Sequence, residues 1–352
     1  MAPILPTPIL LAILDDYQGI AEPYFAPLKS TFSITVFRDT LLPYNHPATP
    51  QNIKQQLINR LKPYTVISSM RERTPFPAGL LKQLPNLKLL LTTGLRNDAI
   101  DMQAAKELGI HVTGAVGKGR STSVQLAAKK RGLDPTTQHA IALILGIARG
   151  LASDDAEVKA GGWQTDLATG LSGKTLSALG LGRLGGNVAR IMYQSFGMRI
   201  LAWSSNLTQE AADEKAKAFG LPVEEEDGRK VFQVVSKEEL FKEADVLSVH
   251  YVLSDRSWGI VGASDLALLK PAAFFVKKGK IRGSAADVFD IEPLPKESRW
   301  RTVAWGKEGR SKVLLSPHMG YVEEELIRKL YDDQAEIVER WHKGEGLLNV
   351  LA

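Results

Sequence analysis

Short apolar runs alternate with segments of helical spacing over residues 8–114, and this alternation restricts the possible folds most strongly. The runs are bounded by turn residues, as strands are: "ILLAILDD", "FSITVFR", "YTVISSM", "LKLLLTTG" and "IHVTGA". The helical segments between them are Ala21–Lys29, Thr49–Leu61, Pro77–Leu84 and Asp101–Leu108. Such alternation predicts a parallel sheet covered by helices. A second series begins at Gly173, so we expect an α/β protein with two parallel-sheet domains.

Composition supports a globular enzyme-sized chain and excludes several classes of protein. The 352 residues suit about two domains of ~150 residues each. A net charge of +5, spread along the chain, does not indicate a nucleic-acid partner. The absence of cysteine excludes disulfides, thiolate zinc sites and cysteine nucleophiles, and we expect no metal ion. The N-terminal apolar run Ile9–Leu14 is interpreted as a buried strand, and no run approaches the ~18 residues of a membrane span. We therefore expect a cytoplasmic protein with no membrane partner.

The segment 115–136 interrupts the alternation and is predicted to be a basic linker or exposed insertion. It reads "AVGKGRSTSVQLAAKKRGLDPT" and has little apolar periodicity. Its spacing does not match the phosphate loop G-x-x-x-x-G-K-[ST], and its cations are interpreted as a solvated face. An apolar helix is expected at Thr137–Arg149, between Pro135 and Gly150, and a polar helix at Glu323–Lys343.

The most informative motif is "GLGRLG", which follows a predicted strand at Thr175–Leu179 and opens a helix. Gly180 permits the tight turn, Gly182 lets a pyrophosphate approach the backbone, and Gly185 lets helix and strand pack closely. Arg183 and Leu184 lie at the expected helix N-terminus, whose free N–H groups attract phosphates. The sequence thus predicts a dinucleotide site; a purely structural glycine turn is the alternative.

The end of the next predicted strand, Met198–Trp203, bears on the choice of dinucleotide. An NAD-selective site places Asp or Glu about 20 residues after the motif to bind the ribose 2′-hydroxyl. Ser204 stands at that position, and Ser205 and Asn206 supply no arginine for a 2′-phosphate. NADP(H) is therefore permitted and slightly favoured but not specified, and NAD(H) stays open.

Four further stretches complete a pattern: "GSAADVFDIEPLP", "VLLSPHMGY", "SVHYVLSDRSWGIVG" and "LTTGLRNDAID". Together they closely resemble the D-isomer-specific 2-hydroxyacid dehydrogenases, and "GKTLSALGLGRLG" resembles fungal members. The resemblance implies two doubly wound domains. A flavodoxin-like substrate domain would comprise 1–114, completed by 319–352, and a Rossmann dinucleotide-binding domain would comprise 137–318. It also implies a homodimer formed through the cofactor domain.

The resemblance assigns the chemistry to a few residues. His318, in P-H-x-G, would exchange a proton with the C2 oxygen, and Glu292, in x-E-P, would hold that histidine. A carboxylate beside a histidine raises the histidine pKa and fixes its tautomer, as general acid catalysis requires. Asp287 would bind the nicotinamide carboxamide. The structural alternatives are a surface turn at Glu292, a loop position at His318 and a turn aspartate at Asp287.

The remaining implied residues lie beside the nicotinamide and the substrate. His250 and Tyr251 match the strand end next to the nicotinamide, although a core histidine is an equal alternative. Backbone N–H groups of Gly94, Leu95 and Arg96 would hold the substrate carboxylate. Arg71 and Arg96 are cationic neighbours of this loop, or are simply solvated.

One connection departs from the family pattern. The family places a T-[SA]-R-G loop, which carries a catalytic arginine, and a helix between the strands expected at Ala272–Val276 and Ser284–Val288. Here only Lys277–Gly283 lies between them. A parallel crossover needs a dozen or more residues, so we expect that these strands cannot pair in parallel without deformation. This deletion and the insertion at 115–136 fit altered splicing or a faulty gene model.

Two functional hypotheses follow. The first is an NAD(P)-dependent oxidoreductase that interconverts a small 2-keto acid and a D-2-hydroxy acid, with low turnover. Lys278, Lys280 or Arg282 would replace the missing arginine, and a lysine would recognise a carboxylate less well because it offers no planar fork. The second is a catalytically weak dinucleotide-binding protein, corepressor-like or a pseudoenzyme.

Overall fold

The computed structural model describes residues 8–120, 132–164, 166–251, 257–275, 281–307 and 309–352. The chain divides into two compact units. Unit 1 comprises Met1–Lys130, Phe289–Lys296 and Val322–Ala352, and unit 2 comprises Arg131–Val288 and Glu297–Tyr321. Each unit is an α/β domain built on one parallel sheet, which confirms the predicted fold class.

Unit 1 contains a five-stranded parallel sheet in the order β2-β1-β3-β4-β5. Its strands are β1 (Ile9–Ile13), β2 (Phe32–Val36), β3 (Val66–Ser68), β4 (Leu89–Thr93) and β5 (His111–Ala115). Its helices are α1 (Glu22–Phe25), the 3-10 helix η1 (Ala26–Leu28), α2 (Gln51–Leu61), α3 (Ala78–Leu81), α4 (Met102–Glu107) and α12 (Glu324–His342). Each predicted strand and helix of this region is confirmed, with the helices shorter than expected.

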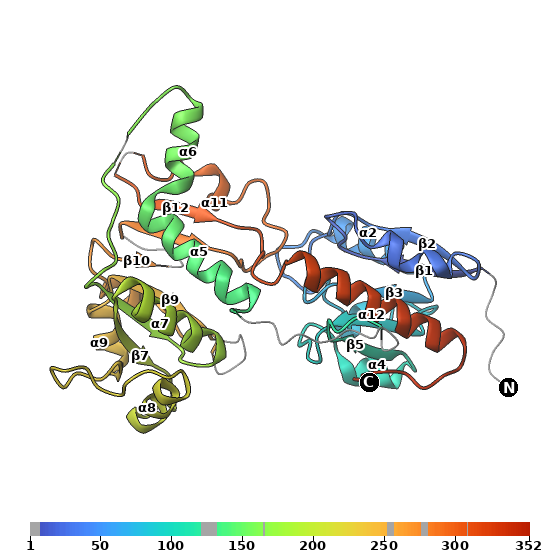
Figure 1. Ribbon diagram of the computed structural model, residues 1–352. Helices are drawn as coiled ribbons and strands as arrows, with labels where there is room; N and C mark the ends of the chain where they lie inside the picture. Colours follow the sequence, from blue (N-terminus) through green and yellow to red (C-terminus); the bar gives the residue numbers. More distant parts are fainter. Residues whose placement is uncertain (1–7, 121–131, 165, 252–256, 276–280, 308) are drawn as a thin grey trace. The chain divides into compact units, whose positions relative to one another are not determined.

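Alternating residues of the unit 1 strands face two different helical layers. Ala12, Ile67, Leu90 and Val112 form one cluster with apolar residues of α2, α3 and α4. On the other face, α12 packs on β4, β5 and α1, and Figure 1 shows it lying across the strands. The strands are apolar on both faces because both are covered, as in parallel sheets generally.

The start of the region predicted as a linker is held by α12. Asp333 of α12 accepts the N–H groups of Val116, Gly117 and Lys118 at 2.9, 2.7 and 3.3 Å. Arg120 forms ion pairs with Asp332 and Glu339 at 3.0 and 2.8 Å. The interpretation of these cations as a solvated face is therefore wrong for Arg120, whereas 121–131 lies outside the described residues.

Unit 2 contains a seven-stranded parallel sheet in the order β12-β11-β10-β9-β6-β7-β8. Its strands are β6 (Thr175–Leu179), β7 (Arg199–Trp203), β8 (Phe232–Val234), β9 (Val246–Val249), β10 (Phe274–Phe275), β11 (Gly283–Ala286) and β12 (Lys312–Leu315). Its helices are α5 (Pro135–Arg149), α6 (Leu151–Lys159), α7 (Arg183–Phe196), α8 (Gln209–Ala218), α9 (Lys237–Lys242), α10 (Ala263–Ala267) and α11 (Arg299–Thr302).

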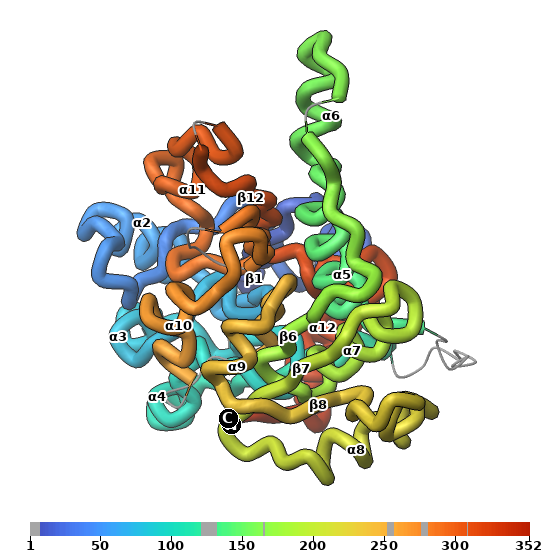
Figure 2. Tube along the Cα trace, turned by 90° about the vertical axis from the view of Figure 1, so that its left-hand side faces the viewer, coloured from blue at the N-terminus to red at the C-terminus, as the bar shows by residue number. Residues whose placement is uncertain are grey.

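Helices cover both faces of the unit 2 sheet. Helices α5 and α7 pack on one face, where α5 contacts β10, β11 and β12 and α7 contacts β6 and β7. Helix α9 packs on the opposite face against β6 and β7 (Figures 1 and 2). The predicted end of α5 at Arg149 is confirmed, whereas the helix begins two residues earlier than predicted, at Pro135. The Asp134 side chain accepts the Thr137 N–H at 3.1 Å, and Gly150 ends the helix with φ of 70°.

β10 and β11 pair in parallel, which the sequence analysis expected only with deformation of the sheet. Phe274 pairs with Gly283 and Phe275 with Ser284 in a parallel ladder. In the described residues the pairing covers two residues of each strand. The Cα atoms of Phe275 and Gly283 are eight residues apart in sequence and can be separated by at most about 29 Å. The residues 276–280 between them lie outside the described residues.

Helix α6 differs from the other long helices of unit 2 because it contributes nothing to the core. It follows α5 directly after Gly150, has no buried residue, and projects beyond the other elements of unit 2 in both Figure 1 and Figure 2. Leu151, Val158, Trp163 and Leu167 of this region are 61%, 52%, 75% and 88% exposed. None of the helices in the described ranges has both the length and the apolar character needed to cross a membrane.

Candidate functional site

Most of the predicted site residues lie along one edge of the unit 2 sheet. All its strands are parallel, so the loops that follow β6, β7, β9, β11 and β12 emerge at the same, carboxyl edge. Strand β6 lies between β7 and β9, and the chain leaves β6 towards β7 before returning to β9. Ligands of doubly wound sheets bind where the strand order reverses in this way.

The glycine turn after β6 has the conformation that the motif predicts. Strand β6 ends at Leu179 and α7 begins at Arg183, with Gly180 at φ of 101°, a region that favours glycine. A Cβ on Gly185 would lie 1.9 Å from the Gly180 carbonyl oxygen, so only glycine fits there. A Cβ on Gly182 would meet nothing within 4 Å, and the backbone is therefore open to a ligand. These residues fit a bound pyrophosphate at the N-terminus of α7.

The two residues after Gly182 differ in their exposure. Arg183 is exposed, and its Nη1 lies 3.1 Å from Oδ2 of Asp134, which caps α5. Leu184 is half-buried in the first turn of α7. The sequence did not indicate the Asp134–Arg183 ion pair, which joins the starts of the two helices on this face.

The loop after β7 is joined to the loop after β9. The half-buried Ser204 follows β7, and the Tyr251 hydroxyl accepts the N–H of Ser205 at 3.0 Å. The Tyr251 ring also stacks on Trp203, with ring centres 6.4 Å apart. Tyr251 therefore contacts the segment where the ribose of a dinucleotide was predicted to bind.

His250 packs against the glycine turn. A Cβ on Gly180 would lie 3.1 Å from the His250 carbonyl oxygen, and one on Gly185 would lie 3.1 Å from its ring. Burial lowers the pKa of His250 to about 4, and its Nε2 lies 2.9 Å from Oγ of Ser248. A neutral, buried ring near neutral pH supports the alternative of a core histidine, placed where it supports the turn.

Asp287 organises the loop that carries His318. It follows β11, and its Oδ1 accepts the N–H of Met319 at 2.8 Å while its Oδ2 accepts the N–H of Gly320 at 3.0 Å. Its carbonyl oxygen accepts the N–H of His318 at 2.7 Å. His318 has a left-handed backbone, with φ of 56°, and its ring packs edge-on against Tyr321.

Two residues that the sequence analysis did not single out complete this group. Nε2 of His139, on α5, lies 3.1 Å from Oδ1 of Asp287 and 2.8 Å from Oγ of Ser316. The Ser316 hydroxyl donates to the same Asp287 oxygen. Ser316 stands inside the quoted "SPHMG" stretch, so its position was a usable signal. No sequence signal indicated His139, because only the fold brings α5 to the ends of β11 and β12.

The predicted substrate loop lies in unit 1, after β4. Gly94 has φ of 87°, and Nη1 of Arg71 lies 2.8 Å from the position that a Gly94 Cβ would occupy. Leu95 is 59% exposed. Arg96 forms a two-bond ion pair with Asp98, at 3.0 and 2.9 Å. Arg71 is therefore the better-placed cation at this loop.

Glu292 also belongs to unit 1, within Phe289–Lys296. Its Oε1 accepts the N–H of Phe289 at 2.8 Å, which closes a local turn. Because His318 belongs to unit 2, the pairing of Glu292 with His318 stays a prediction.

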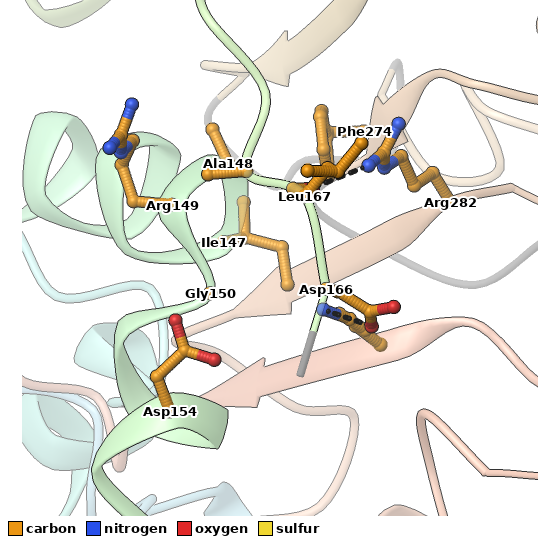
Figure 3. Close-up of a pocket in the computed structure, with 11 residues that line it drawn as sticks. Ile147, Ala148, Arg149, Gly150, Asp154, Asp166, Leu167, Phe274 and Arg282 are labelled. Carbon is orange, nitrogen blue, oxygen red and sulfur yellow. Dashed lines mark hydrogen bonds and ion pairs between the residues drawn. The ribbon is translucent and has the colours of Figure 1, made fainter. Parts of the chain in front are cut away.

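Arg282 cannot replace the missing arginine, and this part of the hypothesis is wrong. It precedes β11 and therefore lies at the amino edge of the sheet, opposite Asp287 and His318. There its Nη2 donates to the Leu167 carbonyl at 2.8 Å, beside the Lys312–Asp166 ion pair (Figure 3). Lys278 and Lys280 lie outside the described residues. Within the described ranges, no cluster of His, Asp and Glu is arranged to hold a metal ion.

Comparisons with known proteins agree on one family. Residues 141–277 match the family "D-isomer specific 2-hydroxyacid dehydrogenase, NAD binding domain". The chain is 29% identical to glyoxylate reductase of Thermococcus litoralis over 292 residues, which are 76% of this chain and 77% of that protein. It is 26% identical to hydroxypyruvate reductase of Thermotoga maritima, over 85% of this chain and 91% of that one.

A solved structure extends the likeness to both units. The crystal structure of phosphoglycerate oxidoreductase from Vibrio cholerae aligns with 96% of this chain and 99% of its own, with a TM-score of 0.74 and 31% identity. Many other solved chains match as well, including a D-lactate dehydrogenase from Aquifex aeolicus with NAD and lactic acid bound, at 20% identity and a TM-score of 0.61. With its glycine turn, its P-H-x-G loop and these relatives, the chain belongs to the D-isomer-specific 2-hydroxyacid dehydrogenase family and carries that family's NAD-binding domain.

Proposed function

We propose that the chain interconverts a small 2-keto acid and a D-2-hydroxy acid with NAD(H). The observation that carries the proposal is the shared edge of the unit 2 sheet. The glycine turn, which requires glycine at positions 180 and 185, and the loop of His318 both emerge there. A dinucleotide at the turn and a proton-transfer group beside it are the two components that this chemistry needs.

Each residue has a defined task in this proposal. When bound, NAD(H) supplies or accepts the hydride at C2 of the substrate. Gly180–Gly185 and the first turn of α7 bind the pyrophosphate through backbone N–H groups. His318 donates a proton to the C2 oxygen in reduction and takes it back in oxidation, and Glu292 orients the imidazole. Gly94–Arg96 holds the substrate carboxylate through its N–H groups, with Arg71 as the nearby cation.

Asp287 has two roles in this proposal, support of the His318 loop and contact with the nicotinamide carboxamide. Both of its side-chain oxygens already accept backbone N–H groups of the His318 loop. A carboxylate oxygen has two lone pairs, so a further donor can still be accepted. The geometry nevertheless favours support of the loop as its first task.

We also propose that turnover is low. The family's carboxylate-binding arginine is absent from the sequence between β10 and β11, and the family match ends at Lys277, where the short connection begins. Arg282 lies at the wrong edge of the sheet. The same observation favours the second candidate, a catalytically weak dinucleotide-binding protein that acts as a corepressor or a pseudoenzyme.

Binding and turnover are measured separately to test this proposal. NADH and NADPH are titrated by calorimetry, and reduction of glyoxylate and hydroxypyruvate is followed at 340 nm. We expect saturable NADH binding and slow reduction; the lack of a carboxylate at Ser204 also leaves NADPH as a second ligand. Inserting a T-S-R-G loop with a helix after Val276 is expected to raise turnover. Failure to bind either dinucleotide contradicts the proposal, and turnover at the usual dehydrogenase rate contradicts the impairment.

A homodimer and a cytoplasmic location complete the proposal. The exposed apolar residues Leu151, Val158, Trp163 and Leu167, on and after α6, support self-association through unit 2. Light scattering after size exclusion is expected to give twice the chain mass of 38.5 kDa, and V158E with L167E is expected to give monomers. Cell fractionation tests the location.

A further inference from the structure

The contacts of His139 define how its protons are arranged. Its Nε2 faces two oxygens, Oδ1 of Asp287 at 3.1 Å and Oγ of Ser316 at 2.8 Å. The Ser316 hydroxyl gives its own proton to Asp287, so both oxygens act as acceptors towards the ring. Nε2 must therefore carry a hydrogen, and His139 donates it to both.

This arrangement is not a nucleophile–base–acid triad. In such a triad one ring nitrogen accepts the serine proton while the other donates to the carboxylate. Here a single nitrogen contacts both partners, and the serine is oriented towards the carboxylate. The His139, Ser316 and Asp287 side chains therefore form a set of donors around one carboxylate oxygen, and the group that they orient is Asp287.

Asp287 in turn holds a backbone that needs support. His318 has a left-handed backbone, which is sterically unfavourable for a non-glycine residue. The N–H groups of His318, Met319 and Gly320 all bond to Asp287, the first to its carbonyl and the others to its side chain. The backbone that carries the His318 ring is therefore held by one aspartate.

We propose that His139, acting with Ser316, is a positioning residue for His318. It fixes the Asp287 carboxylate from the side of α5, so that the carboxylate holds the loop with the imidazole in its working orientation. His139 and Asp287 are 24% and 17% exposed, so water competes only partly for these bonds. The inference rests on the proposed function for its catalytic meaning, but its structural claim about His318 stands apart from turnover.

The test uses paired substitutions in the full chain. H139F keeps a ring and removes the donor, whereas H139Q keeps an N–H donor at about the same reach, and S316A removes the second donor. H111F is the matched control, since His111 is exposed at the start of β5 in unit 1. The readouts are the ¹⁵N signals and pH titration of the His318 ring, NADH affinity, and kcat and KM. With six histidines in the chain, H318Q identifies the His318 signal.

We expect H139F to shift the His318 ring signals and its titration midpoint and to lower kcat about tenfold, since small displacements of a catalytic group are costly. NADH affinity and KM are expected to change less than about twofold, as for a substitution outside the binding site. H139Q is expected to restore both the ring signals and kcat. S316A is expected to shift the His318 ring signals and to lower kcat, as H139F does. H111F is expected to change neither the ring signals nor kcat.

Each outcome decides a separate claim. If H139F leaves the His318 signals and kcat as in the wild type, the inference is overturned while the proposed function stands. If the wild type binds NADH but turns over no keto acid, the function fails, yet a His318 shift in H139F that H139Q reverses still supports the inference. A variant that changes only thermal stability and NADH affinity overturns the inference, because a merely structural role has that signature.

Discussion

Two loops at the same sheet edge of unit 2 are held by different physical means. The glycine turn after β6 is fixed by close approach of backbones, since a Cβ on Gly185 would lie 1.9 Å from the Gly180 carbonyl oxygen and no side chain fits. The loop Pro317–Gly320 after β12 is fixed by hydrogen bonds from distant residues, namely Asp287 and, through it, His139. Steric exclusion is encoded within six consecutive residues. The second loop instead depends on Asp287, which lies 32 residues before Met319, and on His139, which lies 148 residues before Asp287.

The two loops should therefore respond differently to substitution. A substitution in the glycine turn forces backbone apart and damages packing and binding together. A substitution around Asp287 removes donors or acceptors and changes the orientation of one loop.

Gly185→Ala is expected to have the largest effect. Its Cβ would lie 1.9 Å from the Gly180 carbonyl oxygen, so helix α7 or the turn must move. We expect a loss of roughly 3 kcal/mol or more in the free energy of unfolding, the upper end for overpacking, and no measurable NADH binding. Urea unfolding and calorimetry measure both quantities.

Gly182→Ala is the matched control for this prediction. Its Cβ would meet nothing within 4 Å, and its φ of −70° suits any residue. We expect the stability of the wild type but weaker NADH binding, since the added methyl group occupies the space through which the pyrophosphate approaches. Equal stability of the two variants contradicts the idea that steric exclusion holds the turn.

Acid is expected to weaken the glycine turn through His250. Burial lowers the pKa of this histidine from 6.5 to about 4, so the unfolded chain takes up its proton more readily than the folded chain. The contribution of neutral His250 to the free energy of unfolding is complete above pH 6.5 and is lost as the pH falls towards 4. The loss has an upper limit of about 3 kcal/mol. The measurement is the free energy of unfolding against pH for the wild type and H250Q.

Comparison with H250Q is needed because a group in unit 1 acts in the opposite sense. Burial raises the pKa of Asp15 from 3.8 to about 6, so its protonation stabilises the folded chain as the pH falls through that range. The contribution of Asp15 is the same in both proteins and cancels in their difference. A difference that stays constant from pH 7 to pH 4 would rule out the role of His250.

Asp287→Asn is expected to loosen the loop Pro317–Gly320 and to leave the glycine turn unchanged. Whichever way the amide turns, its NH2 group faces the N–H of Met319 or of Gly320, and one donor loses its acceptor. We expect a loss of about 2 kcal/mol in the free energy of unfolding, the cost of one unsatisfied buried group. NADH binding should be retained within about threefold, because the glycine turn is unaffected.

D290N is the control for this substitution. It removes the same charge from Asp290, which is exposed and does not hold the His318 loop. A D287N protein with unchanged stability would show that the loop is held by something other than this carboxylate. Abolished NADH binding in D287N would instead support a direct contact of Asp287 with the nicotinamide.

These contrasts also explain which parts could be predicted from the sequence. The strand, turn and helix around Gly180–Gly185 depend on neighbours along the chain, and each boundary of β6 was predicted correctly. The cap of α5 at Asp134 and its end at Gly150 are local in the same way. The role of His139 could not be predicted, because its partners come from β11 and β12 through the fold of the sheet.

The parallel pairing of β10 and β11 was not expected from the sequence for a similar reason. The rule that parallel strands need a long crossover assumes strands of ordinary length, and the sequence suggested five residues for each. In the described residues β10 is Phe274–Phe275, and it pairs in parallel with both β9 and β11. These pairings join segments that are distant in sequence, which no local pattern reveals. The Glu292–His318 pair stays a prediction for a related reason, since its members belong to different units.

Tyr251→Phe is expected to have the smallest effect. It tests whether the residues next to the glycine turn are held by hydrogen bonds or by packing. The substitution keeps the ring on Trp203 but removes the hydroxyl that accepts the Ser205 N–H at 3.0 Å. Ser205 is exposed, so water replaces the lost acceptor, and we expect less than about 1 kcal/mol in the free energy of unfolding. If Tyr251 orients the ribose segment, NADH affinity falls about threefold while the affinity for nicotinamide mononucleotide, which lacks the adenosine half, is unchanged. Equal losses of affinity for both ligands would place Tyr251 beside the nicotinamide, as the family resemblance implied. Tyr251 would then belong with the hydrogen-bonded loops rather than with the glycine turn.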